Sequence, residues 1–269
     1  MRAAAIQMTS GRDVALNLEA AGELVATAAG DGAKLVVLPE NFSFLGATDA
    51  ERLAAAEAPG EGPAQTFLAE QALRHAIWLV GGTIPIAAGD GRVRSRSLLL
   101  GPDGGRVAAY DKIHLFDVRV PDNEAESYRE SATTEPGTEV VAVETPLGCI
   151  GMTVCYDLRF PGLFHRLGQL GMEILVLPAA FTVPTGRVHW EPLLRARAIE
   201  SLCYVVASGQ WGEHAGGRKT YGHSLIVSPW GEILAERESG AGAVSAELDM
   251  IRLEEIRAKF PTLEHRREL

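Results

Sequence analysis

The sequence is poor in cysteine, and its three cysteines, Cys149, Cys155 and Cys203, form no CxxC pair. An odd number of cysteines argues against a disulfide framework. No HxxxH motif or clustered Cys/His spacing offers a zinc site, so we expect no metal and no cofactor. The expected free thiols leave one question, which is whether any of them is reactive.

Long apolar runs and basic clusters are also missing. No window is apolar enough over a membrane-spanning length, and the start, MRAAAIQM, is too short for a secretory signal peptide. The 25 Lys and Arg are outnumbered by 35 Asp and Glu, which gives a formal net charge of -10. Such a chain repels nucleic-acid phosphates and anionic membrane surfaces. We expect a cytoplasmic protein that binds neither nucleic acids nor membranes.

The composition that is present is typical of a folded protein. Hydrophobic residues make up 46% and charged residues 22% of the 269 positions. The sequence contains no internal repeat and no low-complexity linker. We therefore expect one domain over residues 1–269.

The hydrophobic pattern alternates between strand and helix. Buried strands are expected at 3–8, 34–40, 77–86 and 172–181. Helical periodicity occurs at 13–29, 63–75, 161–171 and 190–202. The turns PDGG, TPLG and PWGE each separate two apolar runs, as in hairpins. Two mixed sheets with helices on their outer faces would bury all these runs, so we expect an α+β fold arranged as a four-layer α-β-β-α sandwich.

Three chemically useful side chains follow strands. Glu40 comes directly after Pro39 at the end of a strand, Lys112 follows another strand, and Cys155 lies between a strand and a helix that opens near Pro161. Strand ends converge on one sheet edge, where ligands usually bind. A nearby helix N-terminus is expected to lower the pKa of the thiol.

Each of these residues also has an ordinary interpretation. A lone cysteine is commonly a buried core residue, a glutamate at a strand end is usually solvated or caps a helix, and a lysine there is often an edge charge. Only the three together, Glu40, Lys112 and Cys155, call for a chemical explanation.

The segments that carry these residues resemble the nitrilase superfamily of carbon-nitrogen hydrolases. LPENFSF, YDKIHLFD and TVCYDLRFP occur in the family order, and LVLPAAFTVPTGRVHWEPLLRARAIESLCYVVASGQ and YGHSLIVSPWGEILAE extend the similarity over nearly the whole chain. Within the superfamily the sequence looks like the Nit branch, and is most similar to deaminated glutathione amidases, with omega-amidases as near neighbours. The resemblance implies the same sandwich fold. It also implies a homodimer or higher homo-oligomer formed by packing helical faces, with the helix carrying Arg195, Arg197 and Glu200 in the interface.

The resemblance implies that a small carboxylate-bearing amide is the substrate. Cys155 would attack the amide, Glu40 would act as the general base, and Lys112 with the backbone N–H of Tyr156 would hold the oxyanion. The products would be a carboxylic acid and ammonia, formed through a thioester on Cys155.

Further residues are assigned with an alternative for each. Glu130 matches a second glutamate of the Nit branch and would hold Lys112, although it would otherwise be a solvated loop carboxylate. Arg159 stands where related carbamoylases carry an arginine that grips the substrate carboxylate, or it caps the neighbouring loop. Three more candidates for substrate contact could equally be surface or packing residues: Tyr128, Arg129 and Thr185.

Other residues are expected to have structural roles. Cys149 and Cys203 lie in apolar runs and should be packing residues, although Cys149 could also act as a resolving thiol if Cys155 were a redox sensor. The histidines His114, His189 and His223 should organise loops. The loop VPDNEAESYRES carries Asp122 and Asn123 where small residues are common in the branch, which leaves the lid shape and the substrate preference open.

Three other functions use the same sequence features. An omega-amidase acting on 2-oxoglutaramate-like acids and a hydrolase of N-carbamoyl compounds would both use the same triad. A catalytically silent binding protein could also be built on the same fold.

Overall fold

The computed structural model describes residues 1–119 and 127–267, and its first sheet is built mostly from the N-terminal half. The strand order is β17-β1-β2-β3-β5-β4, and β6 also pairs with β5. The bounds are β1 Arg2–Gln7, β2 Leu35–Val37, β3 Trp78–Val80, β4 Ile84–Ala87, β5 Val93–Leu100, β6 Arg106–Asp111 and β17 Gly242–Glu247. Strands β1, β2 and β3 run parallel, whereas β17, β4 and β6 pair antiparallel with their neighbours.

The second sheet is built from the C-terminal half, in the order β16-β15-β12-β11-β10-β9. Its bounds are β9 Ala142–Thr145, β10 Gly148–Met152, β11 Ile174–Ala179, β12 Tyr204–Gly209, β15 Ser224–Val227 and β16 Ile233–Arg237. Strands β10, β11 and β12 are parallel, and the outer strands are antiparallel. Both sheets are therefore mixed, as the sequence predicts.

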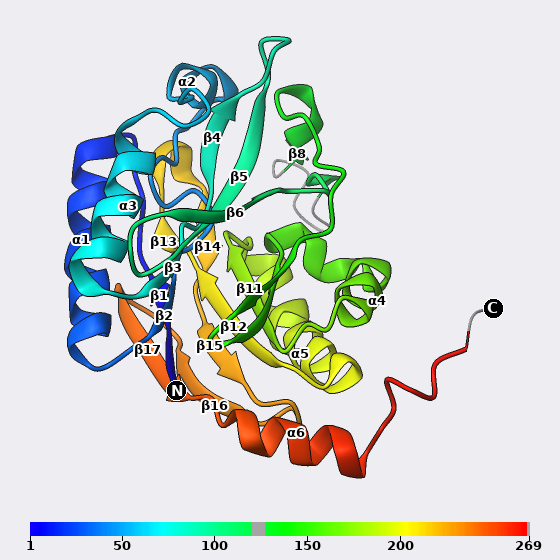
Figure 1. Ribbon diagram of the computed structural model, residues 1–269. Coiled ribbons are helices and arrows are strands. Elements are labelled where there is room, and N and C mark those ends of the chain that lie inside the picture. Colours follow the sequence, from blue (N-terminus) through cyan, green and yellow to red (C-terminus); the bar gives the residue numbers. More distant parts are fainter. Residues whose placement is uncertain (120–126, 268–269) are drawn as a thin grey trace.

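Helices cover the outer faces of the two sheets (Figure 1). Helices α1 (Val14–Gly30) and α3 (Pro63–His75) pack on the first sheet, and α4 (Pro161–Gln169) and α5 (Val183–Ser201) on the side of the second. The remaining elements are α2 Asp49–Ala54, α6 Met250–Lys259, the ribbons β7 Asp117–Arg119 with β8 Ser127–Arg129 and β13 Trp211–Glu213 with β14 Lys219–Tyr221, and the 3-10 turns η1 Glu130–Ala132, η2 Cys155–Arg159 and η3 Ala215–Gly217. The predicted four-layer α-β-β-α sandwich is confirmed.

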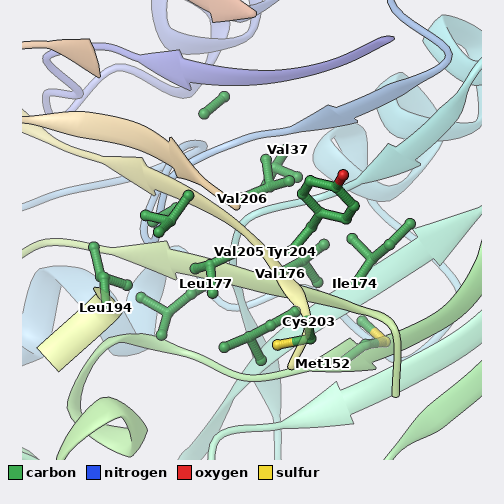
Figure 2. Close-up of a cluster of buried hydrophobic side chains, with 14 of the residues drawn as sticks. Val37, Met152, Ile174, Val176, Leu177, Leu194, Cys203, Tyr204, Val205 and Val206 are labelled. Carbon is green, nitrogen blue, oxygen red and sulfur yellow. The ribbon is translucent and has the colours of Figure 1, made fainter. Parts of the chain in front are cut away.

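Side-chain alternation along β1 explains why two sheets stack. Ala3 and Ala5 face the second sheet, whereas Ala4 and Ile6 belong to the core under α1 and α3. Successive side chains of a strand point to opposite faces, so a strand that is apolar throughout must be covered on both sides. Figure 2 shows the larger core, in which Val37 of β2 lies near Val176 and Val206 of the second sheet.

The three predicted hairpins are present, but the expected strand over 77–86 is wrong. The hairpins are β5–β6, β9–β10 and β15–β16. The run at 77–86 divides into β3 and β4, which are separated in the sheet by β5. Gly82 breaks the run because it adopts a φ of 47°, and a Cβ there would lie 2.1 Å from the carbonyl oxygen of Pro39. Helix α5 also begins earlier than expected, at Val183 rather than Trp190.

Within residues 1–119 and 127–267, no helix is both long enough and apolar enough to cross a membrane.

Candidate active site

Glu40, Lys112 and Cys155 line one cavity of about 890 Å³. Glu40 follows β2, Lys112 directly follows β6, and Cys155 follows β10. All three are buried, with exposed fractions of 4%, 2% and 7%. The expected convergence of strand ends thus occurs: the ends of β2 and β6 in the first sheet and of β10 in the second sheet meet at this cavity.

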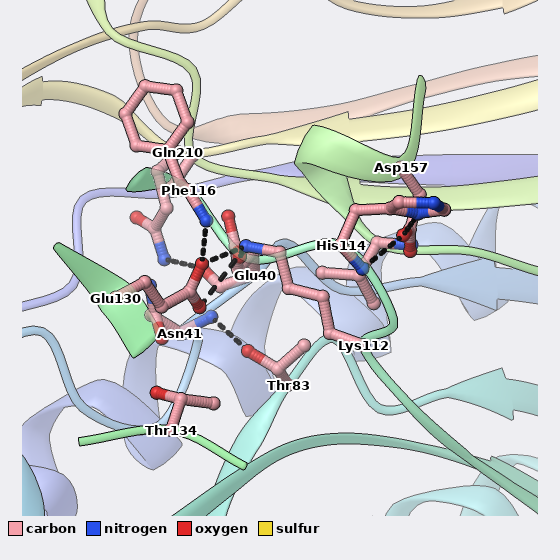
Figure 3. Close-up of polar contacts among 12 residues, drawn as sticks. Glu40, Asn41, Thr83, Lys112, His114, Phe116, Glu130, Thr134, Asp157 and Gln210 are labelled. Carbon is pink, nitrogen blue, oxygen red and sulfur yellow. Dashed lines mark hydrogen bonds and ion pairs between the residues drawn. The ribbon is translucent and has the colours of Figure 1, made fainter. Parts of the chain in front are cut away.

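The break at Gly82 also positions Glu40. The close approach of Gly82 to the Pro39 carbonyl leaves no room for a side chain, and the next residue, Thr83, accepts a hydrogen bond from the Asn41 backbone N–H at 2.8 Å. Gln210, which directly follows β12 of the second sheet, donates to the Glu40 backbone carbonyl at 3.1 Å. The backbone that carries the carboxylate is therefore held from both sheets (Figure 3).

Lys112 lies between two carboxylates (Figure 3). Its Nζ donates to Oε1 of Glu40 at 2.8 Å and to Oε2 of Glu130 at 2.9 Å. Glu130 also accepts from the Phe116 backbone N–H at 2.7 Å. The side chain of Glu130 is only 15% exposed, so it is a fixed partner of the lysine and not a solvated loop carboxylate.

These neighbours determine the charge states of the pair. Burial by itself would lower the pKa of Lys112, but the charges of Glu130 and then Glu40 raise that pKa above its usual range. Burial pushes the pKa of Glu130 upward, yet Lys112 and then Arg52 lower it below its ordinary value. Lys112 is therefore a cation, and Glu130 an anion, at neutral pH.

Cys155 begins the 3-10 turn η2 in a left-handed conformation, with a φ of 48°. A non-glycine residue at positive φ is uncommon and persists only where its surroundings hold it in place. Arg197 of α5 provides part of this support, because its Nε and Nη2 donate to the Leu158 carbonyl at 3.0 and 2.9 Å. Arg197 is thus engaged within the chain.

Asp157 supplies the other part, and sequence reasoning missed it. This fully buried carboxylate accepts from the Tyr110 hydroxyl at 2.7 Å and the Val154 backbone N–H at 2.9 Å. It also bonds the backbone N–H of His114 at 3.0 Å and its Nδ1 at 2.7 Å. One side chain therefore ties the end of β6, next to Lys112, to the turn that carries Cys155 (Figure 3).

The expected lowering of the thiol pKa is wrong. Burial and then the charge of Glu40 raise the pKa of Cys155 well above its ordinary value, against the opposing charge of Lys112 and a hydrogen bond with the Ala180 backbone. The resting nucleophile is a protonated thiol, so any attack by it needs a base. Glu40 lines the same cavity, and its charge acts on that thiol.

The remaining predicted residues line the same cavity. Arg159 lies over the rings of Tyr156 and Phe181, at 5.8 and 5.2 Å from their centroids, and hydrogen-bonds Nδ1 of His189 at 3.1 Å. The Arg159 side chain therefore lines the cavity and does not cap the η2 loop. His189 lies on α5 and orients this arginine, and the loop-organising role expected for it stays a prediction.

Tyr128, Arg129 and Thr185 also border the cavity. The ring of Tyr128 lies 5.0 Å from that of Phe116, whose backbone holds Glu130. Thr185, in the first turn of α5, shares a hydrogen bond of 2.9 Å with Thr182.

Two further cavity arginines, Arg52 and Arg218, were also not identified from the sequence. Arg52 of α2 donates to the Thr134 hydroxyl at 2.5 Å. Arg218 donates to the Ala180 carbonyl at 3.0 Å and lies 5.3 Å from the centroid of the Tyr128 ring. Arg52 lies on the short helix α2 and Arg218 in the loop before β14, and neither segment carries a periodic pattern that would place its arginine at this cavity.

The other thiols are not part of this site. Cys149 and Cys203 are buried packing residues, and burial raises their pKa values to about 11 and about 12. Cys149 is a free thiol whose Sγ lies 3.5 Å from the Leu170 carbonyl, and it does not line the cavity that contains Cys155. The loop positions Asp122 and Asn123 lie outside the described residues.

Comparison with known proteins agrees with the motifs. The model of the carbon-nitrogen hydrolase family matches residues 2–258. A deaminated glutathione amidase of Synechocystis sp. is 42% identical over 268 residues, which cover 98% of this chain and 97% of that protein. The crystal structure of the C. elegans NitFhit protein superposes with a TM-score of 0.90 at 37% identity, covering 99% of this chain and 65% of that one. Saccharomyces cerevisiae Nit3, a member of branch 10 of the nitrilase superfamily, superposes with a TM-score of 0.87 at 30% identity, covering 97% and 94%. The chain therefore belongs to the carbon-nitrogen hydrolase family of enzymes, in the Nit branch of the nitrilase superfamily.

Proposed function

We propose that this chain is a cysteine amidase whose substrate is deaminated glutathione, and that residues 1–269 form one hydrolase domain. The observation that carries the proposal is the buried Glu40–Lys112–Glu130 arrangement beside the Cys155 thiol in one cavity. The substrate is suggested by the relatives that carry this name, such as the Synechocystis protein.

In the first half-reaction, Glu40 takes the thiol proton as the sulfur of Cys155 attacks the amide carbonyl. Lys112 and the backbone N–H of Tyr156 hold the negative oxygen of the tetrahedral intermediate. Glu40 then gives its proton to the nitrogen, the carbon–nitrogen bond breaks, and an acyl thioester remains on Cys155. A single carboxylate thus moves one proton from sulfur to nitrogen.

In the second half-reaction, Glu40 takes a proton from water as the water oxygen attacks the thioester. The carbon–sulfur bond breaks and the proton returns to the sulfur. A primary amide releases ammonia in this scheme. Deaminated glutathione has a substituted amide nitrogen, so the released amine is cysteinylglycine and the released acid is 2-oxoglutarate.

Arg159 would hold a substrate carboxylate near the reacting carbonyl. Its guanidinium is held by two rings and by the neutral His189, and no carboxylate pairs with it within residues 1–119 and 127–267. A guanidinium with free donors suits the two oxygens of a carboxylate. Arg129, Tyr128 and Thr185 would complete the wall around the substrate.

The direct test compares substrates and a nucleophile variant. We expect the wild-type protein to release cysteinylglycine from deaminated glutathione with a higher kcat/KM than it releases ammonia from 2-oxoglutaramate. We expect Cys155→Ala to release neither product while its circular dichroism spectrum and melting temperature stay close to those of the wild type. A preference for the short amide would assign an omega-amidase, and turnover by Cys155→Ala would refute the mechanism.

The homodimer is also part of this proposal. Val188 and Ile199 of α5 are 64% and 48% exposed, and Trp230, at 55%, follows β15 in the loop whose Gly231 lies against Ile199. A helix face of this kind suits a second copy of the chain. Light scattering should give twice the mass of the chain, and the Ile199→Asp variant should have the mass of a monomer.

The cytoplasm is the proposed compartment because its reducing conditions suit three free cysteines.

A further inference from the structure

Two arginines in the cavity share an unusual environment. Arg159 and Arg218 each lie over an aromatic ring and each donate to one neutral acceptor, His189 or the Ala180 carbonyl. Within residues 1–119 and 127–267 neither has a carboxylate partner, and the buried Nε of Arg218 has no hydrogen-bond partner. Both side chains are partly buried, and a partly buried guanidinium without a counter-charge has donors left for an anion.

The other cations of the cavity all act on carboxylates. Lys112 is paired with two carboxylates and Lys219 with Glu213 at 3.3 Å, and the charges of Arg52 and Arg129 act on Glu130 and Asp117. In a chain with a net charge of -10, carboxylates are abundant, so an unpaired cavity arginine is a specific feature. Arg159 and Arg218 are therefore two side chains in one cavity that can each bind an anionic group.

The two side chains are at different depths relative to the nucleophile. Arg159 lies 5.8 Å from the ring centroid of Tyr156, the residue that directly follows Cys155, whereas Arg218 donates to the Ala180 carbonyl and lies over the ring of Tyr128. Tyr128 is the middle residue of strand β8 in the short β7–β8 ribbon. Arg159 is thus the nearer cation and Arg218 the more distant one.

We propose that Arg218 binds a carboxylate on the amine side of the scissile bond, so that the enzyme selects amides with carboxylates on both sides. This inference rests on the proposed function and deepens it. In deaminated glutathione the acyl arm from the scissile carbonyl to its carboxylate is shorter than the cysteinylglycine arm. The carboxylate of the shorter acyl arm would therefore bind Arg159, and the carboxylate of the longer cysteinylglycine arm would bind Arg218. A 2-oxoglutaramate-like acid has no carboxylate on the amine side and leaves Arg218 unused.

The test removes the carboxylate and the arginine separately. Deaminated glutathione and its analogue with a C-terminal carboxamide are compared in the wild type, Arg218→Met, Arg218→Lys and the control Lys219→Met. We expect the wild type to prefer the carboxylate by about 10- to 100-fold in kcat/KM, mainly through KM, since hydrogen bonds to charged groups have that value. Arg218→Met should abolish this preference, Arg218→Lys should restore part of it, and Lys219→Met should retain it.

The outcomes separate this inference from the proposed function. A purely structural role for Arg218 predicts that Arg218→Met lowers turnover of both substrates equally and keeps the ratio, which overturns the inference. A wild type that hydrolyses both substrates equally well also overturns it, but leaves the amidase intact. A wild type that hydrolyses neither substrate refutes the proposed function and the inference with it.

Discussion

Asp157 should be one of the costliest positions to change outside the reacting groups. In Asp157→Asn the amide oxygen replaces only one carboxylate oxygen. The amide NH₂ then faces either the Val154 N–H or the His114 N–H, so one buried backbone donor loses its acceptor. An unpaired buried donor costs about 1–3 kcal/mol, and we expect a destabilisation of about 2 kcal/mol. Asp157→Ala leaves both backbone donors and the Tyr110 hydroxyl unpaired and should cost about 3–5 kcal/mol.

Thermal unfolding followed by circular dichroism measures this effect. For a chain of this size, about 2 kcal/mol corresponds to a decrease in melting temperature of roughly 4–8 °C. Asp103→Asn is a matched control, because that carboxylate is exposed and bonds only the Gly105 N–H of its own turn. The control should change stability by less than about 0.5 kcal/mol. Melting temperatures of both Asp157 variants within about 1 °C of the wild type would refute the reasoning.

Two further predictions concern the charges around the thiol. Glu40→Gln should abolish amide turnover, yet it removes a charge that raises the pKa of Cys155, so iodoacetamide should alkylate Cys155 faster at neutral pH than in the wild type; slower alkylation would contradict the assigned cause. Glu130→Gln removes the charge that contributes most to raising the pKa of Lys112, so that pKa falls and the alkaline limb of the kcat/KM profile should move to lower pH; an unchanged alkaline limb would show that Glu130 does not control the lysine.

The fold was largely predictable because the two sequence features that indicate it, apolar runs and turn residues, are local. Apolar runs identify strands, and turn residues such as those of PDGG identify hairpins, without knowledge of distant contacts. The strand expected over 77–86 fails for a long-range reason. Gly82 is required by the approach of the Pro39 carbonyl from the segment after β2, which a sequence pattern does not show. The same contact supports Glu40, so the departure from the pattern lies at the candidate site.

The candidate site was predictable in part for a similar reason. Glu40, Lys112 and Cys155 each follow a strand, and strand ends meet, so their proximity follows from topology. Asp157 and Arg218 obey no such rule. The Asp157 carboxylate is held by the Tyr110 hydroxyl of β6, and the Arg218 guanidinium by the Ala180 carbonyl that follows β11. The thiol pKa also depends on burial beside Glu40, and this outweighs the local turn geometry that suggested a lower value.

The two carboxylates on Lys112 are not equivalent, and the difference indicates which of them exchanges protons. Glu130 is bonded by Lys112 and by the Phe116 N–H and is further stabilised by Arg52, so it is held as a permanent anion. The Glu40 side chain has Lys112 on Oε1 and the thiol of Cys155 as its neighbours among the described residues. Protonating Glu40 therefore disrupts fewer interactions than protonating Glu130. When Glu40 takes the thiol proton, Lys112 keeps its bond to Glu130, stays charged and remains directed at the developing oxyanion. In the proposed mechanism Glu130 thus makes the lysine a fixed charge, and this leaves Glu40 free to act as the base.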